Sequence, residues 1–339
     1  MRKVIPAVLV VVLAVSASTA ADKITLKQRY PAGTYVMTTE ADMKQDITMA
    51  PAGEMRQNIK MLMAFEMTAE KPAADKTQVV HISYKRIKMS MTGGPMELTF
   101  DSERPPVASE ETSPVSMMMW QMHKPLVGAK FDITIDGEGK PVKVTGMDRL
   151  WEEMGKANPA AAPMMANMKK SFGDETMKMM FSQTADQLPK APVAVGEKWK
   201  ANQVLPMPML GNMTIEQECT LKEVRKTSAG RIARIDFVGN FSKGKPKAGA
   251  NAAPMGMTIS KMAGQQTGTI RFNVDTGMVV EMVTDQKMTM EMAPPGQEGA
   301  APAMTMKQNG QTRMTLTKGK YKSSAAGKSS ATSAKTKGF

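Results

Sequence analysis

The 339-residue chain contains one cysteine, Cys219, and two histidines, His81 and His123. A single cysteine excludes an intramolecular disulfide, so buried apolar area must stabilise the fold. Zinc sites draw their ligands largely from cysteine and histidine, and these three residues lie in no recognised zinc-binding spacing. We therefore expect Cys219 to be a small buried residue and His81 to be an ordinary strand residue.

Motifs of the common enzyme classes are absent as well. The sequence contains no Gly-x-Ser-x-Gly elbow, no P-loop and no dinucleotide-binding fingerprint, and nothing selects a catalytic pair among its carboxylates. We predict a protein that is not an enzyme and binds no cofactor.

Long apolar runs are missing after the N-terminus, which begins MRKVIPAVLVVVLAVSASTAAD. Two basic residues, an apolar run from Val4 to Val15 and a series of small residues are typical of a secretory signal peptide cut before Ala21 or Asp22. No later segment approaches the ~20 apolar residues of a transmembrane helix. We predict export to the periplasm or the extracellular space, and a mature chain that is not transmembrane.

Acidic residues are absent from the last 22 residues, 318–339, which are rich in lysine, serine and alanine. This composition predicts a disordered tail because it cannot bury enough surface to offset chain entropy. Its lysines could attach the protein to an anionic envelope surface or simply increase solubility, and both readings stay open. The tail lacks interleaved aromatic residues, so no nucleic-acid partner is expected.

What the chain does have is a dominant period of two. One face of 35–49 carries Tyr35, Met37, Thr39, Ala41, Met43, Gln45, Ile47 and Met49. The apolar face of 278–292 carries Met278, Val280, Met282, Met288, Met290 and Met292. Such alternation predicts antiparallel strands with one solvated face, and the unusual length of these runs indicates a curved sheet. Short turns at Asp136–Pro141 and Asp275–Gly277 are typical of hairpins.

Helical spacing interrupts the strands in 113–125, 146–156 and 161–189, with breaks at Pro163, Gly173 and Pro189. In the last segment the expected buried stripes are Met164, Met165, Met168 and Phe172, followed by Met177, Met180, Phe181, Thr184 and Leu188. We predict a mainly β (β-rich α+β) fold with long antiparallel curved sheets in two related halves and a helical segment between them. The expected parts are a signal peptide (1–21), a first half (22–150), a helical connector (151–190), a second half (191–317) and the tail (318–339).

Methionine is the most unusual component, with 37 residues. Its flexible, polarisable side chain suits surfaces that accept irregular partners. We interpret the methionine-rich sheet face as a binding surface for a lipid or an apolar peptide. The candidate residues are Met37, Met43, Met61, Met63, Met282, Met288 and Met290. The alternative is a core that these side chains and the helices fill completely, which would suit a structural or interaction protein.

A second hypothesis is a Cu(I) site of the cell envelope, since thioethers are soft ligands. The segment SPVSMMMWQMHKPLVG, residues 113–128, places Met118, Met119, Met122 and His123 near one helix end. Methionine is spread through the whole chain, however, whereas a dedicated copper domain would concentrate it beside histidine.

Several segments resemble a known family. AGTY at 32–35, VGEKW at 195–199 and FDITIDGEGKPVKVTGMD at 131–148 are similar to the secreted bacterial proteins of domain-of-unknown-function family 6263. The resemblance implies no established activity, and it transfers no catalytic residue to this chain. The layout of long strands and inserted helices is also similar to the half-barrels of lipoprotein carriers, as an analogy of fold.

Overall fold

The computed structural model describes residues 22–51, 53–94, 97–104, 120, 124–157, 162–207, 211–244, 258–294 and 301–323. The expected signal peptide lies outside these ranges. So does most of the segment 113–125 that we expected to be helical, and at its end the structure places a short 3-10 helix at Lys124–Leu126.

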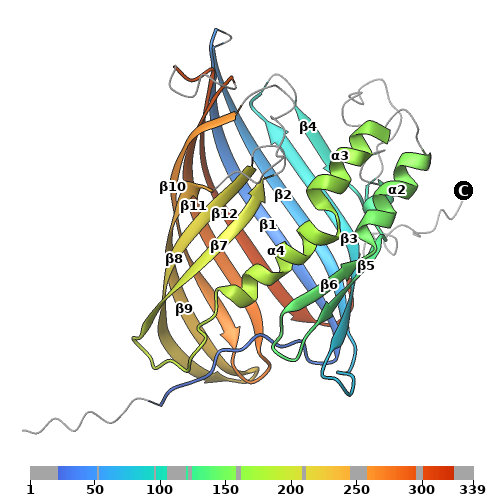
Figure 1. Cartoon of the computed structure of the whole chain (residues 1–339), viewed down its shortest axis with the longest axis vertical. Coiled ribbons are helices and arrows are strands. Elements are labelled where there is room, and N and C mark those ends of the chain that lie inside the picture. The colour runs from blue at the N-terminus through green and yellow to red at the C-terminus, as the bar shows by residue number, and fades with distance from the viewer. Residues whose placement is uncertain are drawn as a thin grey trace, which may run out of the picture.

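Twelve antiparallel strands form one continuous sheet, which confirms the predicted mainly β fold (Figure 1). Their order is β6-β5-β3-β2-β1-β12-β11-β10-β9-β8-β7, with β4 beside β3. The first six are β1 (Gly33–Met49), β2 (Gly53–Ala69), β3 (Gln78–Thr92), β4 (Leu98–Asp101), β5 (Lys130–Ile135) and β6 (Pro141–Thr145). The others are β7 (Lys198–Met207), β8 (Gly211–Thr227), β9 (Gly230–Lys243), β10 (Thr258–Asn273), β11 (Met278–Ala293) and β12 (Met304–Lys318).

The first and the last of the described strands meet in the middle of this sheet. β1 pairs with β12 from Tyr35 opposite Lys318 to Met49 opposite Met304, without a break in register. β2 to β6 extend the sheet on one side of this pair, and β11 to β7 extend it on the other. Strands as long as the 17 residues of β1 curl when they twist, and the sheet curves until its edge strands β6 and β7 face one another (Figure 1).

Three helices follow β6, as the spacing predicts: α2 (Met147–Ala157), α3 (Ala162–Phe172) and α4 (Asp174–Asp186). α2 and α4 begin side by side. The side chain of Asp174 caps the start of α2, and the side chain of Asp148 caps the start of α4. The Asp174 carboxylate accepts from the Met147 N–H at 2.9 Å, and the Asp148 carboxylate accepts from the Asp174 N–H at 3.1 Å. α4 then contacts both edge strands, β6 and β7, so it lies across the gap between them (Figure 1).

The helices bury apolar side chains against β1, β2, β3, β5 and β6 to form the first core cluster, which includes Trp151, Met165 and Met177. Phe172 and Phe181 also pack there, as predicted. The prediction for Met180 was wrong, because its side chain is exposed on α4. A second cluster lies among β7 to β11, and a third, rich in methionine, lies at the far end of β10 to β12.

Residues 22–32 run beneath the sheet and connect its two edges. Ile24 exchanges two backbone hydrogen bonds of 2.9 Å with Val193, shortly before β7. At the other edge, Lys27 forms a 3.0 Å ion pair with Glu138 in the β5–β6 turn. Between these contacts Leu26 is buried in the second core cluster. This segment therefore fastens the base of the curved sheet.

The alternation of inward and outward side chains along the strands follows the expected pattern with one exception. In β1 every other residue from Glu40 to Thr48 is exposed, and the alternate positions are buried or half-buried, as predicted. In β11 a β-bulge near Val280 changes the register, so Val279 pairs with the buried Phe272. Val279 is buried and Val280 is only half-buried, so the predicted alignment of Val280 with Met282 was wrong. A bulge inserts one residue, and alternation along one strand does not reveal it.

The boundary expected at Lys318 also differs from the structure. Lys318 is the last residue of β12, and the Gly319 N–H donates to the Thr34 carbonyl at 2.9 Å. The chain stays against the sheet as far as Tyr321, whose backbone N–H donates to Glu66 at 2.9 Å. Residues 318–323 therefore belong to the fold, because strand pairing and side-chain hydrogen bonds hold residues whose composition alone predicts disorder.

The contact between residues 22–32 and the β5–β6 turn predicts a specific stability defect. Gly139 has φ +83°, and a Cβ there would lie 2.2 Å from the Gln28 carbonyl oxygen. Gly196 has φ +93° with no heavy atom within 4 Å of that position. Both Gly→Ala variants carry the strain of positive φ, about 1–3 kcal/mol, but only Gly139→Ala adds a clash of about 1–3 kcal/mol. Urea unfolding should show the larger loss for Gly139→Ala; equal losses would mean that the segment does not pack closely against this turn.

Candidate functional site: the inner face of the sheet

We call the side of the sheet that packs against α2–α4 its inner face. Strand registers place all seven predicted methionines on this face. They come from three strands: Met37 and Met43 from β1, Met61 and Met63 from β2, and Met282, Met288 and Met290 from β11. Residues far apart in sequence are thus brought to one surface.

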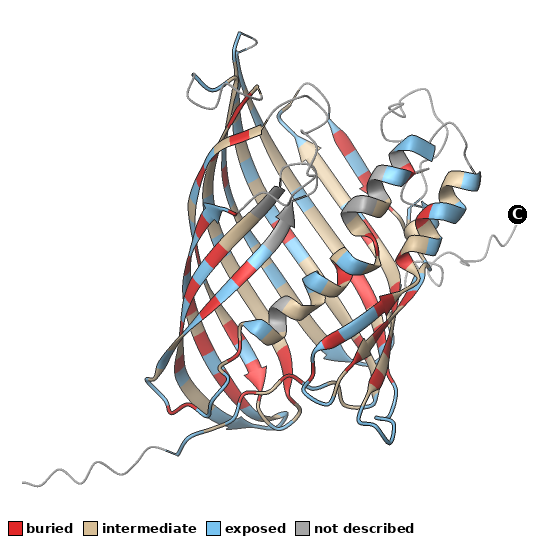
Figure 2. Ribbon diagram, in the orientation of Figure 1, coloured by how far each residue is buried: buried red, intermediate tan, exposed pale blue. Residues whose placement is uncertain are grey.

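The seven methionines differ in how far other side chains cover them. Met290 is completely buried in the third core cluster, so protein atoms fill the space around it. Met37 and Met63 pack against the first cluster, Met282 against the second and Met288 against the third. Met43 and Met61 are half-buried and belong to none of these three clusters of described residues. Figure 2 shows that the inner strands seen behind α4 are mostly half-buried rather than buried.

The position of Met43 and Met61 follows from the registers. Met61 lies opposite Ala41, and Met43 lies opposite Ile59 and Gly310. Met63, which packs against the first cluster, lies toward one end of these strands. Met306, which packs against the third cluster, lies toward the other end. Met43 and Met61 therefore occupy a stretch of the inner face between two packed regions.

Polar side chains cross the same middle stretch, and we call them the glutamine belt. Its members are Gln57, Gln45, Gln308, Gln286, Gln266, Gln217 and Gln203, from seven strands. Gln57 donates to Gln45 at 2.6 Å, and Gln45 donates to Gln308 at 2.9 Å. Across the sheet, the residue opposite Gln286 is Gln266. The sequence pattern already placed Gln45 on this face, but alternation within single strands did not show that glutamines from seven strands would line up across the sheet.

Gln217 is a member of the belt whose amide is buried without a hydrogen bond in the described part of the protein. The residue is buried, and neither its side-chain oxygen nor its nitrogen makes a hydrogen bond in the described part of the protein. It extends over Gly239, where a Cβ would lie 2.8 Å from the Gln217 Cγ. A buried amide without partners costs about 1–3 kcal/mol, so a hydrogen-bonding group brought to this position would recover stability.

Cys219 lies on the same face of β8 as Gln217 and is buried, as predicted. Burial, and secondarily the charge of Glu218, raise the pKa of its thiol to about 12, which keeps it protonated and unreactive at neutral pH. Within the described ranges, no group of three or more histidine, cysteine and acidic side chains could hold a metal ion. The alternative copper residues Met118, Met119, Met122 and His123 lie outside those ranges.

His81 lies on the outer face of β3 and forms a polar cluster that the sequence did not reveal. Its Nε2 is 2.8 Å from Glu70 and its Nδ1 is 2.7 Å from Asp132. The bond to Glu70, then the bond to Asp132, raise the pKa of His81 above its usual value. Because both ring nitrogens already face carboxylates, the cluster connects the end of β2 to β3 and β5 rather than presenting a free base.

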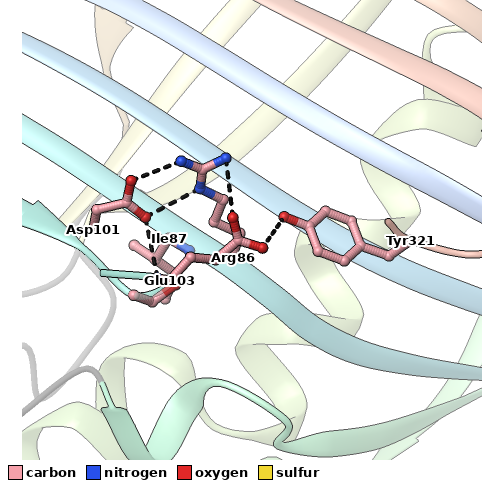
Figure 3. Close-up of polar contacts among 6 residues, drawn as sticks. Arg86, Ile87, Asp101, Glu103 and Tyr321 are labelled. Carbon is pink, nitrogen blue, oxygen red and sulfur yellow. Dashed lines mark hydrogen bonds and ion pairs between the residues drawn. The ribbon is translucent and has the colours of Figure 1, made fainter. Parts of the chain in front are cut away.

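A second outer-face cluster fastens the residues after β12 (Figure 3). Arg86 binds Asp101 through Nη2 at 2.7 Å and Glu103 through Nη1 at 3.3 Å. Tyr321 donates its hydroxyl to Glu103 at 2.9 Å. Burial, and then the bond to Glu103, raise the pKa of Tyr321 to about 12. The two carboxylates are largely buried, and the positive charge of Arg86 offsets the free-energy cost of burying their negative charges.

Sequence comparison identifies one family. The model of a family of unknown function, DUF6263, matches residues 75–279, which is more than half of the chain. The chain belongs to this family. The match extends from the loop before β3 to the beginning of β11, so β1, β2 and β12 lie outside it. A comparison with curated proteins found no match.

Solved structures show only distant likenesses. Lipovitellin, described for its lipid–protein interactions, aligns with 87% of this chain at 8% identity and a TM-score of 0.41, but the alignment spans only 26% of the lipovitellin chain. DynF from the dynemicin biosynthesis pathway of Micromonospora chersina aligns with 91% of this chain and 89% of its own at 8% identity and a TM-score of 0.20. The beta domain of the Bordetella autotransporter BrkA aligns with 84% of this chain and 99% of its own at 7% identity and a TM-score of 0.26. Likenesses at these TM-scores carry no argument about function.

None of the helices that the structure describes is long and apolar enough to cross a membrane.

The raised pKa of His81 predicts a pH dependence of stability. A histidine whose pKa is higher in the folded state stabilises the fold most below its unfolded pKa of about 6.5, and this contribution disappears as the pH rises through the folded pKa. The difference in unfolding free energy between wild type and His81→Gln should therefore decrease from pH 5.5 to pH 8.5. Chemical denaturation across this range measures it, and a difference that grows with pH would contradict the assignment.

Loss of Arg86 should be more costly than loss of the Tyr321 hydroxyl. Arg86→Met leaves Asp101 and Glu103 largely buried without their cation, and breaking such an arrangement costs about 3–5 kcal/mol. Tyr321→Phe removes one hydrogen bond to a charged acceptor, worth about 1.5–3 kcal/mol. Urea unfolding of both variants tests this order, and similar small losses would show that the cluster contributes little.

Proposed function

We propose that this protein is an exported, non-enzymatic binding protein that accepts the acyl chain of a lipid on the inner face of its sheet. The proposal of export rests on the order of charged, apolar and small residues in 1–21. The proposal of lipid binding rests on the inner face itself. The basic tail would favour residence near an anionic envelope surface.

The observation that carries the proposal is the state of Met43 and Met61. Both project from the inner face between the packed first and third clusters, yet they remain half-buried and outside these described clusters. When a ligand covers such apolar surface, binding is favoured by about 25 cal/mol for each Å² removed from water. Thioether side chains adapt to a flexible chain, so methionine suits an occupant without a fixed shape.

The glutamine belt would determine how a bound lipid is oriented on this surface. Amide groups donate and accept hydrogen bonds without carrying charge, so they match a neutral polar group such as an ester or a protonated carboxyl. An acyl chain lying against Met43 and Met61 would bring such a group close to Gln45, which is two residues from Met43 on the same face of β1. An apolar peptide would need many more hydrogen-bonding partners along its backbone than the belt supplies.

Binding of a fluorescent fatty acid tests the proposal. Met43→Lys should weaken binding at least tenfold while changing the unfolding free energy by less than about 1 kcal/mol, because a half-buried position allows the ammonium to reach water. Met290→Lys should instead destabilise the fold by several kcal/mol, since this residue is completely buried. Fluorescence titration and urea unfolding measure the two effects.

Thr48→Lys is the matched control, because it adds the same charge to the exposed outer face of β1. Its affinity for the fatty acid should equal that of wild type. Equal weakening by Thr48→Lys and Met43→Lys would assign the effect to net charge. Failure of the wild-type protein to bind the fatty acid would leave the inner face as a structural surface and overturn the proposal.

A further inference from the structure

Among the described strands, none pairs with one side of the β7 backbone, because β7 ends the sheet. It pairs with β8 from Lys198 opposite Thr220 to Met207 opposite Gly211, and it is the last strand in the sheet order. A strand of ten residues presents about 33 Å of backbone along its free side. Exposed edges of this length are ready to pair with another strand, and proteins usually cover or interrupt them.

α4 lies near this edge but does not fill the space beside it. A hollow of about 430 Å³ lies between the two elements, lined by Lys178, Met179 and Ser182 from α4 and by Asn202 and Val204 from β7. A second hollow of about 700 Å³ continues along β7 between Lys198 and Asn202, against residues 186–193. Asp186 and Asn202 line both hollows, so together they form one groove along the edge, which we call the β7 groove.

Exposed apolar side chains stand on both walls of the β7 groove. Met179 on α4 is 39% exposed and Val204 on β7 is 46% exposed. Large apolar side chains with this exposure are few in the described part of the protein, and these two line the same hollow. The two hollows together are lined by five lysines and three acidic residues, so the rim carries a modest excess of positive charge.

We propose that the β7 groove binds a peptide segment in extended conformation, which adds a strand to the free edge of β7. An extended peptide offers alternating N–H and C=O groups at the spacing of the β7 backbone, and this complementarity is specific to a strand. Every second side chain of such a peptide points to the same face, so an apolar residue would lie between Met179 and Val204. The site is separate from Met43 and Met61 and does not depend on lipid binding.

A nine-residue fluorescent peptide of alternating valine and threonine is the probe, measured by fluorescence anisotropy with the full chain. Wild type should bind it. The same peptide with N-methyl groups at alternate residues should bind at least tenfold more weakly, because one edge of its backbone then has no N–H groups to donate hydrogen bonds to β7. Val204→Lys should also weaken binding of the unmodified peptide at least tenfold. Val238→Lys is the matched control, since Val238 is 47% exposed on β9 and lies outside the groove.

The controls separate the other outcomes. Circular dichroism should show that both exposed-site variants keep the wild-type fold. The proposal is overturned if wild type does not bind, if N-methylation has no effect, or if Val204→Lys and Val238→Lys behave alike. It is also overturned if light scattering shows a wild-type dimer that Val204→Lys dissociates, because the edge would then be occupied by a second copy of the chain.

Discussion

The pairing of β1 with β12 is the contact on which the rest of the structure depends. It joins the first and the last described strands over fifteen residue pairs, from Tyr35 opposite Lys318 to Met49 opposite Met304, and every other strand is added outward from this pair. Without it the chain would form two smaller sheets, each with an additional exposed edge. With it the curved sheet brings β6 and β7 close enough for α4 to contact both.

The inner face combines two kinds of surface that a simple apolar core would not contain. Its methionines lie at both ends and in the middle, while the glutamine belt crosses the middle from β2 to β7. Gln57 donates to Gln45 and Gln45 donates to Gln308, whereas the buried amide of Gln217 makes no hydrogen bond in the described part of the protein. Burying polar groups in this way lowers stability, and such positions are often retained because they serve recognition.

Several of these features could be predicted from residue spacing. Alternation placed the methionines of β1 and β11 on the correct face, and the glycine and proline breaks located the helices. Spacing could not reveal the bulge at Val280, which depends on pairing with β10. It also could not bring Arg86 to Tyr321, because residues 235 positions apart in sequence meet only once the sheet has formed. The groove beside β7 depends in the same way on where α4 lies.

The central position of the first and last strands also has a consequence for synthesis. β1 (Gly33–Met49) is synthesised well before its partner β12 (Met304–Lys318). Until β12 is made, one side of β1 is an open edge, and the β1–β12 pairing that completes the sheet has the largest sequence separation of the described strand pairs. Such long-range pairing is slow and leaves strands exposed to other chains. The charged residues on its outer face, including Glu40, Asp42 and Lys44, disfavour association with like strands during this interval.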